Sequence, residues 1–179
     1  MRDVTPDSKN HIDLKALIKY LFEFVKHPAK NIATLPDWPW SSLVTLHLLM
    51  TIVSGVLAGL LKINFYRVAA GIFLMPFVST AVVALLSMYL YFYFQFFENR
   101  TESFRKICTL VVLSAIPFYL FQVVSEYFAL ISVVGLCFAS MLAVIGLNEN
   151  FSVVKKRAFQ IMGVMFGLML VTWVANHFS

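Results

Sequence analysis

Charged residues are scarce in this sequence, since Asp, Glu, Lys and Arg together make up 13% of its 179 residues and hydrophobic residues make up 60%. An average soluble domain has roughly 25% charged residues. The shortage excludes an ordinary water-soluble fold and is typical of a membrane protein. Cysteine is also scarce. Cys108 and Cys137 both lie in apolar runs, which argues against a disulfide framework.

Motifs that carry catalysis or bind a metal or a cofactor are missing as well. The sequence has no phosphate-binding glycine loop, no His-Glu-x-x-His, no Gly-x-Ser-x-Gly and no paired acids inside an apolar run. We therefore expect no enzyme, no cofactor and no metal site. The first 40 residues carry eleven charges without an early apolar core. This pattern does not predict a cleavable signal peptide, so the first span should act as an uncleaved signal-anchor.

What the sequence has in abundance is long apolar runs. Residues 68–97 contain no charge, although a membrane span needs only about 20 apolar residues. A helix of that length would tilt, kink or protrude, and Pro76 offers a kink. Its second end, residues 89–97, is crowded with aromatic rings, which prefer the headgroup level of a bilayer.

The remaining apolar runs complete the predicted architecture, an all-α membrane protein. It is a bundle of five transmembrane helices with an N-terminal amphipathic interfacial helix. A cytosolic segment, 1–40, would precede a membrane domain, 41–179, whose spans lie near 41–61, 68–97, 107–124, 127–147 and 158–175. Residues 1–12 are polar and expected to be frayed. Pro117 could bend the third span, and Glu126 would turn an exposed hairpin before the fourth.

Lysine and arginine predict the orientation of these spans. The N-terminal region holds six, the link after the second span three and the link after the fourth span three, against two in the link after the first. With the N-terminus inside, twelve basic residues stay cytosolic and two are translocated. This distribution favours a cytosolic N-terminus and an external C-terminus. Since the basic residues border apolar runs, the net charge of +5 does not predict a nucleic-acid partner.

Residues 13–27 are predicted to form the amphipathic helix, starting at Asp13. Leucine, isoleucine and phenylalanine recur at helical spacing on one face, and Lys15, Lys19 and Lys26 lie on the other. Such a helix suits a membrane interface, although it could also pack on the protein's own cytosolic end, and both can hold. Residues 28–40 should form an extended connector, because they contain three prolines. The connector ends with four candidate partner- or lipid-binding residues: Asp37, Trp38, Pro39 and Trp40.

Small residues and one histidine mark the interior of the predicted bundle. Gly55 with Gly59, Gly163 with Gly167, and Gly135 with Ala139 are spaced four apart, which permits close helix crossings within the bundle or a homodimer face. His47 lies deep in the first span. A lone histidine is a poor metal site, so a neutral, hydrogen-bonded histidine is the favoured interpretation.

The layout resembles the Yip family, five-span membrane proteins named for interaction with Ypt/Rab GTPases, and especially its bacterial relatives. The similarity lies in Val25-Lys26-His27-Pro28, in Asp37-Trp38-Pro39-Trp40 where eukaryotic members carry Asp-Leu-Tyr-Gly-Pro, and in Ala115-Ile116-Pro117-Phe118. The Gly-Tyr element between later spans and the long cytosolic N-terminal domain of eukaryotic members are absent. The resemblance implies a multi-pass protein of membrane-organising type, in bacteria in the cytoplasmic (inner) membrane.

These observations favour a non-enzymatic membrane protein whose basic cytosolic face binds membrane lipids or a protein partner. The alternative is a small transporter or channel-like protein for an ion or solute. Polar residues lining one continuous cavity would favour the alternative. A dry interior filled by leucine and phenylalanine would favour the first function.

Overall fold

The protein is described here by a computed structural model that covers residues 14–125, 127–128 and 130–178. The all-α fold class is confirmed, since the described residues form helices and no strand. Asp13, Glu126 and residues 1–12 lie outside the described residues. The helices are α1 (Leu14–Lys26), α2 (Pro28–Ile32), α3 (Trp40–Leu61), α4 (Phe65–Phe97), α5 (Phe104–Ser114), α6 (Ile116–Ser125), α7 (Leu130–Phe151) and α8 (Lys155–Phe178).

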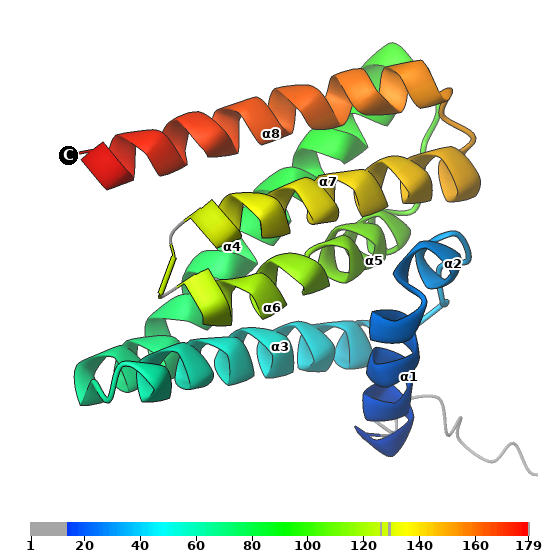
Figure 1. Ribbon diagram of the computed structural model, residues 1–179. Coiled ribbons are helices and arrows are strands. Elements are labelled where there is room, and N and C mark those ends of the chain that lie inside the picture. Colours follow the sequence, from blue (N-terminus) through cyan, green and yellow to red (C-terminus); the bar gives the residue numbers. More distant parts are fainter. Residues whose placement is uncertain (1–13, 126, 129, 179) are drawn as a thin grey trace, which may run out of the picture.

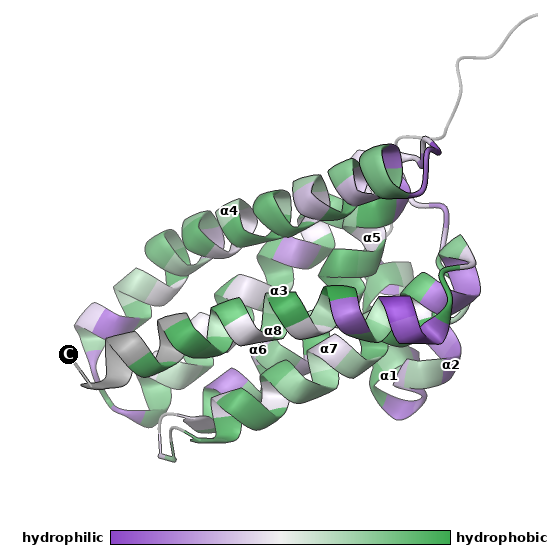
Figure 2. Ribbon diagram, turned by 90° about the horizontal axis from the view of Figure 1, so that it is seen from above, coloured by the Kyte–Doolittle hydropathy of each residue, from purple (hydrophilic) through white to green (hydrophobic). Residues whose placement is uncertain are grey.

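Four segments of the described chain are long and apolar enough to cross a membrane: α3, α4, α5 with α6, and α7. They run side by side with α8, whereas α1 lies across one end of the bundle (Figure 1). The apolar residues cover the length of the bundle, and the hydrophilic ones gather toward its ends (Figure 2). The fifth span, which α8 would supply, stays a prediction.

The third predicted span occupies the centre of the bundle and consists of two helices. α5 ends at Ser114 with Ala115 as its C-cap, and α6 begins directly afterwards with Pro117 in its first turn, where the missing N–H costs no hydrogen bond. Every residue from Ile107 to Ser114 is buried. Together α5 and α6 contact α3, α4 and α7. The bundle is thus assembled around this broken span, and α4 is instead mostly exposed along its length.

The connector and the fourth predicted span differ in part from the helices of the structure. The connector 28–40 is not extended throughout, because Pro28 starts the short helix α2, a position that suits proline's fixed φ. α7, the helix of the fourth predicted span, runs from Leu130 and continues past Leu147 to Phe151. Its polar end stays helical because Asn150 finds hydrogen-bond partners outside the helix, as described below.

Glycine permits one very close crossing, between α3 and α4. A Cβ built on Gly55 would lie 2.7 Å from the Cα of Gly71, and one built on Gly59 would lie 2.6 Å from the backbone nitrogen of Val68. Real Cβ atoms do not approach backbone this closely, so both positions require glycine. At Gly135 the nearest atom is the Cβ of Phe121, also at 2.7 Å.

Gly163 and Gly167 behave differently from the other predicted packing residues. A Cβ at either position would meet nothing within 4 Å. The expectation that they form a close crossing within the bundle is therefore wrong, because this stretch of α8 has open space where a neighbouring helix would have to be. A role for them at a homodimer face stays a prediction.

Candidate functional site

The basic segments that are separated in sequence meet at one end of the bundle. Arg105 at the start of α5 donates to the carboxylate of Asp37 in the connector. Arg157 of α8 lies 3.4 Å from Glu98, which follows α4. Arg100 donates to the carbonyl of Phe151 at the end of α7. These contacts tie the connector and both basic links into one surface, which we call the basic end.

Asn150 fastens the connector to this end. Its side-chain oxygen accepts from the backbone N–H of Leu35 at 3.0 Å, and its side-chain nitrogen donates to the carbonyls of Ile32 at 2.8 Å and Gly146 at 3.1 Å. Its own backbone carbonyl accepts from Lys106. One amide side chain thus forms hydrogen bonds with backbone groups of both the connector and α7. The connector is held in place by α7 and not only by the chain that follows it.

α1 docks on the basic end through one side of its apolar surface. Leu17 and Phe24 are 4% and 1% exposed, and Phe24 belongs to the main hydrophobic core. Between them, the ring of Tyr20 meets Trp38 edge to face with centroids 4.6 Å apart. Burial raises the pKa of Tyr20 to about 12, because the phenolate would lose its hydration. Packing on the protein's own end was one of the two roles predicted for this helix.

The rest of the apolar surface of α1 remains exposed. At 3.6 residues per turn, these side chains form a strip beside the docking face: Leu14, Ile18, Phe22 and Val25. Phe22 is 65% exposed. Lys15, Lys19 and Lys26 border the strip on its other side and are exposed too. Lys26 lies 3.7 Å from Glu23. The helix therefore has a docking face, a free apolar strip and a lysine edge.

The four predicted residues at the end of the connector occupy separate positions. Asp37 pairs with Arg105, Trp38 packs on Tyr20, and Pro39 precedes the first turn of α3 as its N-cap. Trp40 is exposed, with its ring 6.1 Å from that of Phe104. The structure does not join the four into one site. Asp37 and Trp38 contact other elements through their side chains, and Trp40 is 47% exposed.

A cavity of about 300 Å³ lies between the connector and the start of α5. Two basic side chains, Arg105 and Lys106, line it together with the carboxylate of Asp37. Ser103 and Thr109 add hydroxyl groups, and Leu35 and Pro36 close the connector side. Three charged side chains, two of them basic, give this cavity a polar lining.

His47 lies in the middle of α3 and is 5% exposed. Its Nε2 is 3.3 Å from the hydroxyl of Ser79 on α4, and its ring meets Tyr119 of α6 edge to face. The Ser79 hydroxyl also lies 3.1 Å from the carbonyl of Pro76. Within the described residues, no group of three His, Cys, Asp or Glu side chains could hold a metal. This is the geometry of a buried, hydrogen-bonded histidine between three helices.

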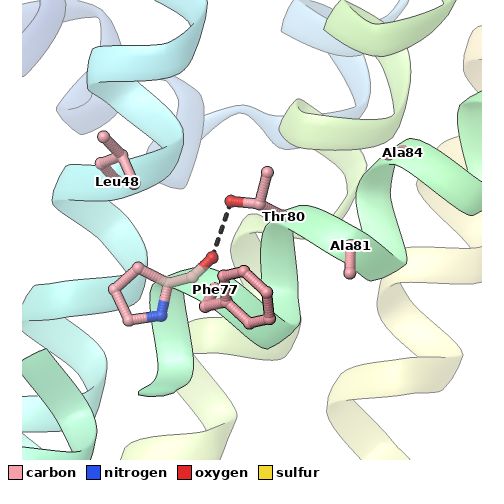
Figure 3. A pocket seen from close by; sticks show the side chains of 6 residues that line it. Leu48, Phe77, Thr80, Ala81 and Ala84 are labelled. Atoms are coloured by element: carbon pink, nitrogen blue, oxygen red, sulfur yellow. Dashed lines mark hydrogen bonds between the residues drawn. The ribbon is translucent and has the colours of Figure 1, made fainter. Parts of the chain in front are cut away.

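A second cavity, of about 470 Å³, lies beside the proline of α4 (Figure 3). Leu48 of α3 forms one wall, and α4 supplies the other residues: Pro76, Phe77, Thr80, Ala81 and Ala84. The one hydroxyl in this lining, that of Thr80, donates to the carbonyl of Pro76 at 2.6 Å. The lining of this second cavity is therefore mostly apolar and presents few groups that could form hydrogen bonds with a ligand.

Sequence reasoning missed three residues of the basic end: Asn150, Arg105 and Lys106. The two basic residues entered only the orientation count, and Asn150 was assigned to a link. One signal was available. Asn148, Glu149 and Asn150 directly follow a long apolar run, which places hydrogen-bonding side chains at the edge of the bundle.

Comparison with known proteins gives one match. The Yip1 domain matches residues 22–176, which is most of the chain and includes the end of α1, the connector and the bundle. No curated protein and no solved structure matches the chain.

Proposed function

The chain belongs to the Yip1 family, and on that premise we propose that it acts without catalysis, by presenting its basic end and α1 to a membrane surface. In this proposal the basic end faces the cytosol and the lipids of the inner leaflet are its first partners. Lysine and arginine resist translocation, which supports this orientation. The same face could also bind a protein partner at the membrane surface.

The split surface of α1 carries the proposal. A helix that only closed the end of the bundle would need the face of Leu17 and Phe24 alone. Among the described residues, no element covers the additional strip of Ile18, Phe22 and Val25, although an apolar strip exposed to water lowers solubility. α1 lies across the bundle axis, so it would lie along a membrane plane (Figure 1). An apolar strip edged by lysines is the pattern of an interfacial helix.

The interior of the bundle supports this function over transport. The largest side chains of its core are fully buried and apolar: Phe24, Phe94, Phe151, Ile32, Leu46, Ile107, Leu110, Leu113, Ile116 and Leu147. The hydroxyls of Thr51 and Ser79 beside His47 bind backbone carbonyls, and the Nε2 of His47 lies 3.3 Å from the Ser79 hydroxyl, whereas its Nδ1 has no partner among the described residues. A packed apolar core offers no favourable path to an ion, because an ion must exchange its water for polar groups.

Spin labels on α1 test the proposal in the full-length protein. Cys108 and Cys137 are replaced by serine, and a single cysteine is placed at Ile18, Phe22 or Glu23. In nanodiscs, labels at Ile18 and Phe22 should be accessible to oxygen and shielded from a water-soluble nickel complex, whereas the Glu23 label should show the reverse. Equal nickel accessibility at all three positions would reject the membrane contact and favour a protein partner for the strip.

A further inference from the structure

We propose that the cavity between the connector and α5 binds the headgroup of a zwitterionic phospholipid with a primary amine. The phosphate would contact Arg105 and Lys106, and the ammonium group would contact Asp37. This inference rests on the proposed function, because it assumes that the basic end lies against lipid. It goes further by naming the class of lipid and the group that selects it.

The start of α5 provides the phosphate side of the site. Ser103 is the N-cap residue, yet its side chain makes no capping hydrogen bond, so its hydroxyl and the N–H groups of the first turn can bind an acceptor. Arg105 uses one N–H on Asp37, and Lys106 uses one on the carbonyl of Asn150. Arginine has five donors and lysine three, so both retain donors for phosphate oxygens. The positive end of the helix dipole adds to their attraction.

Asp37 makes a purely anionic ligand a poor fit. Its carboxylate is already paired with Arg105. An anionic headgroup would compete with this carboxylate for Arg105 and would place two negative groups close together. Arg105 contacts the Oδ1 of Asp37, and the side chain is 87% exposed. Oδ2 can therefore accept from an ammonium group that approaches from outside. A headgroup with a phosphate and an amine is complementary to all three charges.

The position of the cavity favours a lipid over a soluble phosphate ester. Trp40 follows Asp37 by three residues, is exposed, and opens the first span. Tryptophan rings at the end of a span prefer the headgroup level. The volume, about 300 Å³, is at the lower end of the range for small-ligand sites and suits a headgroup whose acyl chains stay in the bilayer.

Lipid-dependent melting of the full-length protein in detergent tests the inference. Three lipids with identical acyl chains are titrated: phosphatidylethanolamine, phosphatidylcholine and phosphatidylglycerol. Their affinities follow from the rise of the melting midpoint with concentration. The parent should prefer phosphatidylethanolamine, because only its amine can donate a charge-assisted hydrogen bond to Asp37. Soluble phosphoethanolamine, added alone, should bind far more weakly than the lipid. Binding of equal strength would assign the site to soluble phosphate esters and overturn the lipid proposal.

Substitutions separate the two halves of the site. Asp37→Asn should lower the affinity for phosphatidylethanolamine about threefold, as expected for one exposed ion pair. The affinity for phosphatidylglycerol should be unchanged or higher. Asp37→Glu should keep the preference. The double variant Arg105→Gln, Lys106→Gln should lower the affinity for each of the three lipids by about tenfold or more. Lys155→Gln is the control, since it removes a basic charge from the same end but not from the cavity.

Three further outcomes would overturn the proposal. These are equal affinities of the parent for the three lipids, an Asp37→Asn variant with unchanged preference, or a Lys155→Gln effect as large as that of the double variant. The last would reduce the site to general surface charge. Phe22→Ser on α1 separates this test from that of the proposed function. It weakens the α1 contact with the membrane but should leave the headgroup preference intact.

Discussion

Substituting alanine at the crossing of α3 and α4 should destabilise the protein by an amount that follows from the geometry. A Cβ on Gly55 would lie 2.7 Å from the Cα of Gly71, and a Cβ on Gly71 would lie 2.5 Å from the carbonyl carbon of Gly55. Carbon atoms pack at about 3.5–4.0 Å, so the two helices must separate by about 1 Å. Both obstacles are backbone atoms, and no side chain can rotate out of the way.

The expected cost follows from overpacking, which destabilises by about 1–3 kcal/mol in well-packed interiors. Taking about 2 kcal/mol, the melting temperature should fall by roughly 4–8 °C for a chain of this size. Alanine is a better helix former than glycine by about 1 kcal/mol, so a loss of stability cannot come from helix propensity. It must come from the separated helices.

The assay is thermal melting in detergent, followed by helical circular dichroism, for Gly55→Ala, Gly71→Ala and a matched control. Gly163→Ala is that control, because a Cβ there meets nothing within 4 Å and the same change of residue should be neutral or slightly stabilising. If the two crossing variants melt like the parent, the close approach of α3 and α4 is refuted. An equal loss in Gly163→Ala would instead place a partner on α8.

Two further predictions concern the basic end. Asn150→Ala should lower the free energy of unfolding by about 2–3 kcal/mol, because three hydrogen bonds to the connector and α7 are lost. It should also raise the rate of hydrogen exchange at the backbone N–H of Leu35, and an unchanged rate would contradict the role of Asn150. Tyr20 ionises at a pKa of about 12 when folded and about 10 when unfolded, so its contribution to stability is complete below pH 10 and should be lost between pH 10 and about 12. Tyr20→Phe should remove that part of the alkaline loss, as measured by melting from pH 9 to 12, and a parallel decline in both proteins would contradict it.

The class of fold was predictable from the sequence because a bilayer imposes a length on every apolar run. The absence of charge from Val68 to Phe97 requires a span wherever the run is placed. Pro117 likewise predicted the bend in the third span, and the helix does break next to it. These signals are local: each is contained in one stretch of chain and needs no knowledge of its neighbours.

The pairing of helices was not predictable, because it depends on which small residues face each other. Gly55 and Gly59 have the same four-residue spacing as Gly163 and Gly167, yet only the first pair meets backbone. The partner of Gly55 is Gly71, which belongs to no such repeat. A spacing shows that a helix can be approached closely, but the approach itself requires a complementary surface on another helix.

The amphipathic helix shows the same limit in a different form. Its single apolar face in sequence is divided in the structure between Leu17 and Phe24, which dock, and Ile18 and Phe22, which do not. Helical periodicity reports only that the residues share one side. Whether water, lipid or protein covers each of them depends on how far the neighbouring connector and Trp38 reach around the helix.

Some of the basic residues that predict the orientation also hold the basic end together, and we expect the two roles to separate by position. Arg100 and Arg105 bind a carbonyl and a carboxylate of other elements, so neutralising them changes packing as well as charge. Lys155 and Lys156 are exposed and make no hydrogen bond or ion pair with the described residues. Orientation depends on the count of basic residues near a span, whichever contacts they make. We therefore expect substitution of the two lysines at the start of α8 to affect orientation alone, whereas substitution of Arg100 or Arg105 should affect both orientation and the architecture of the site.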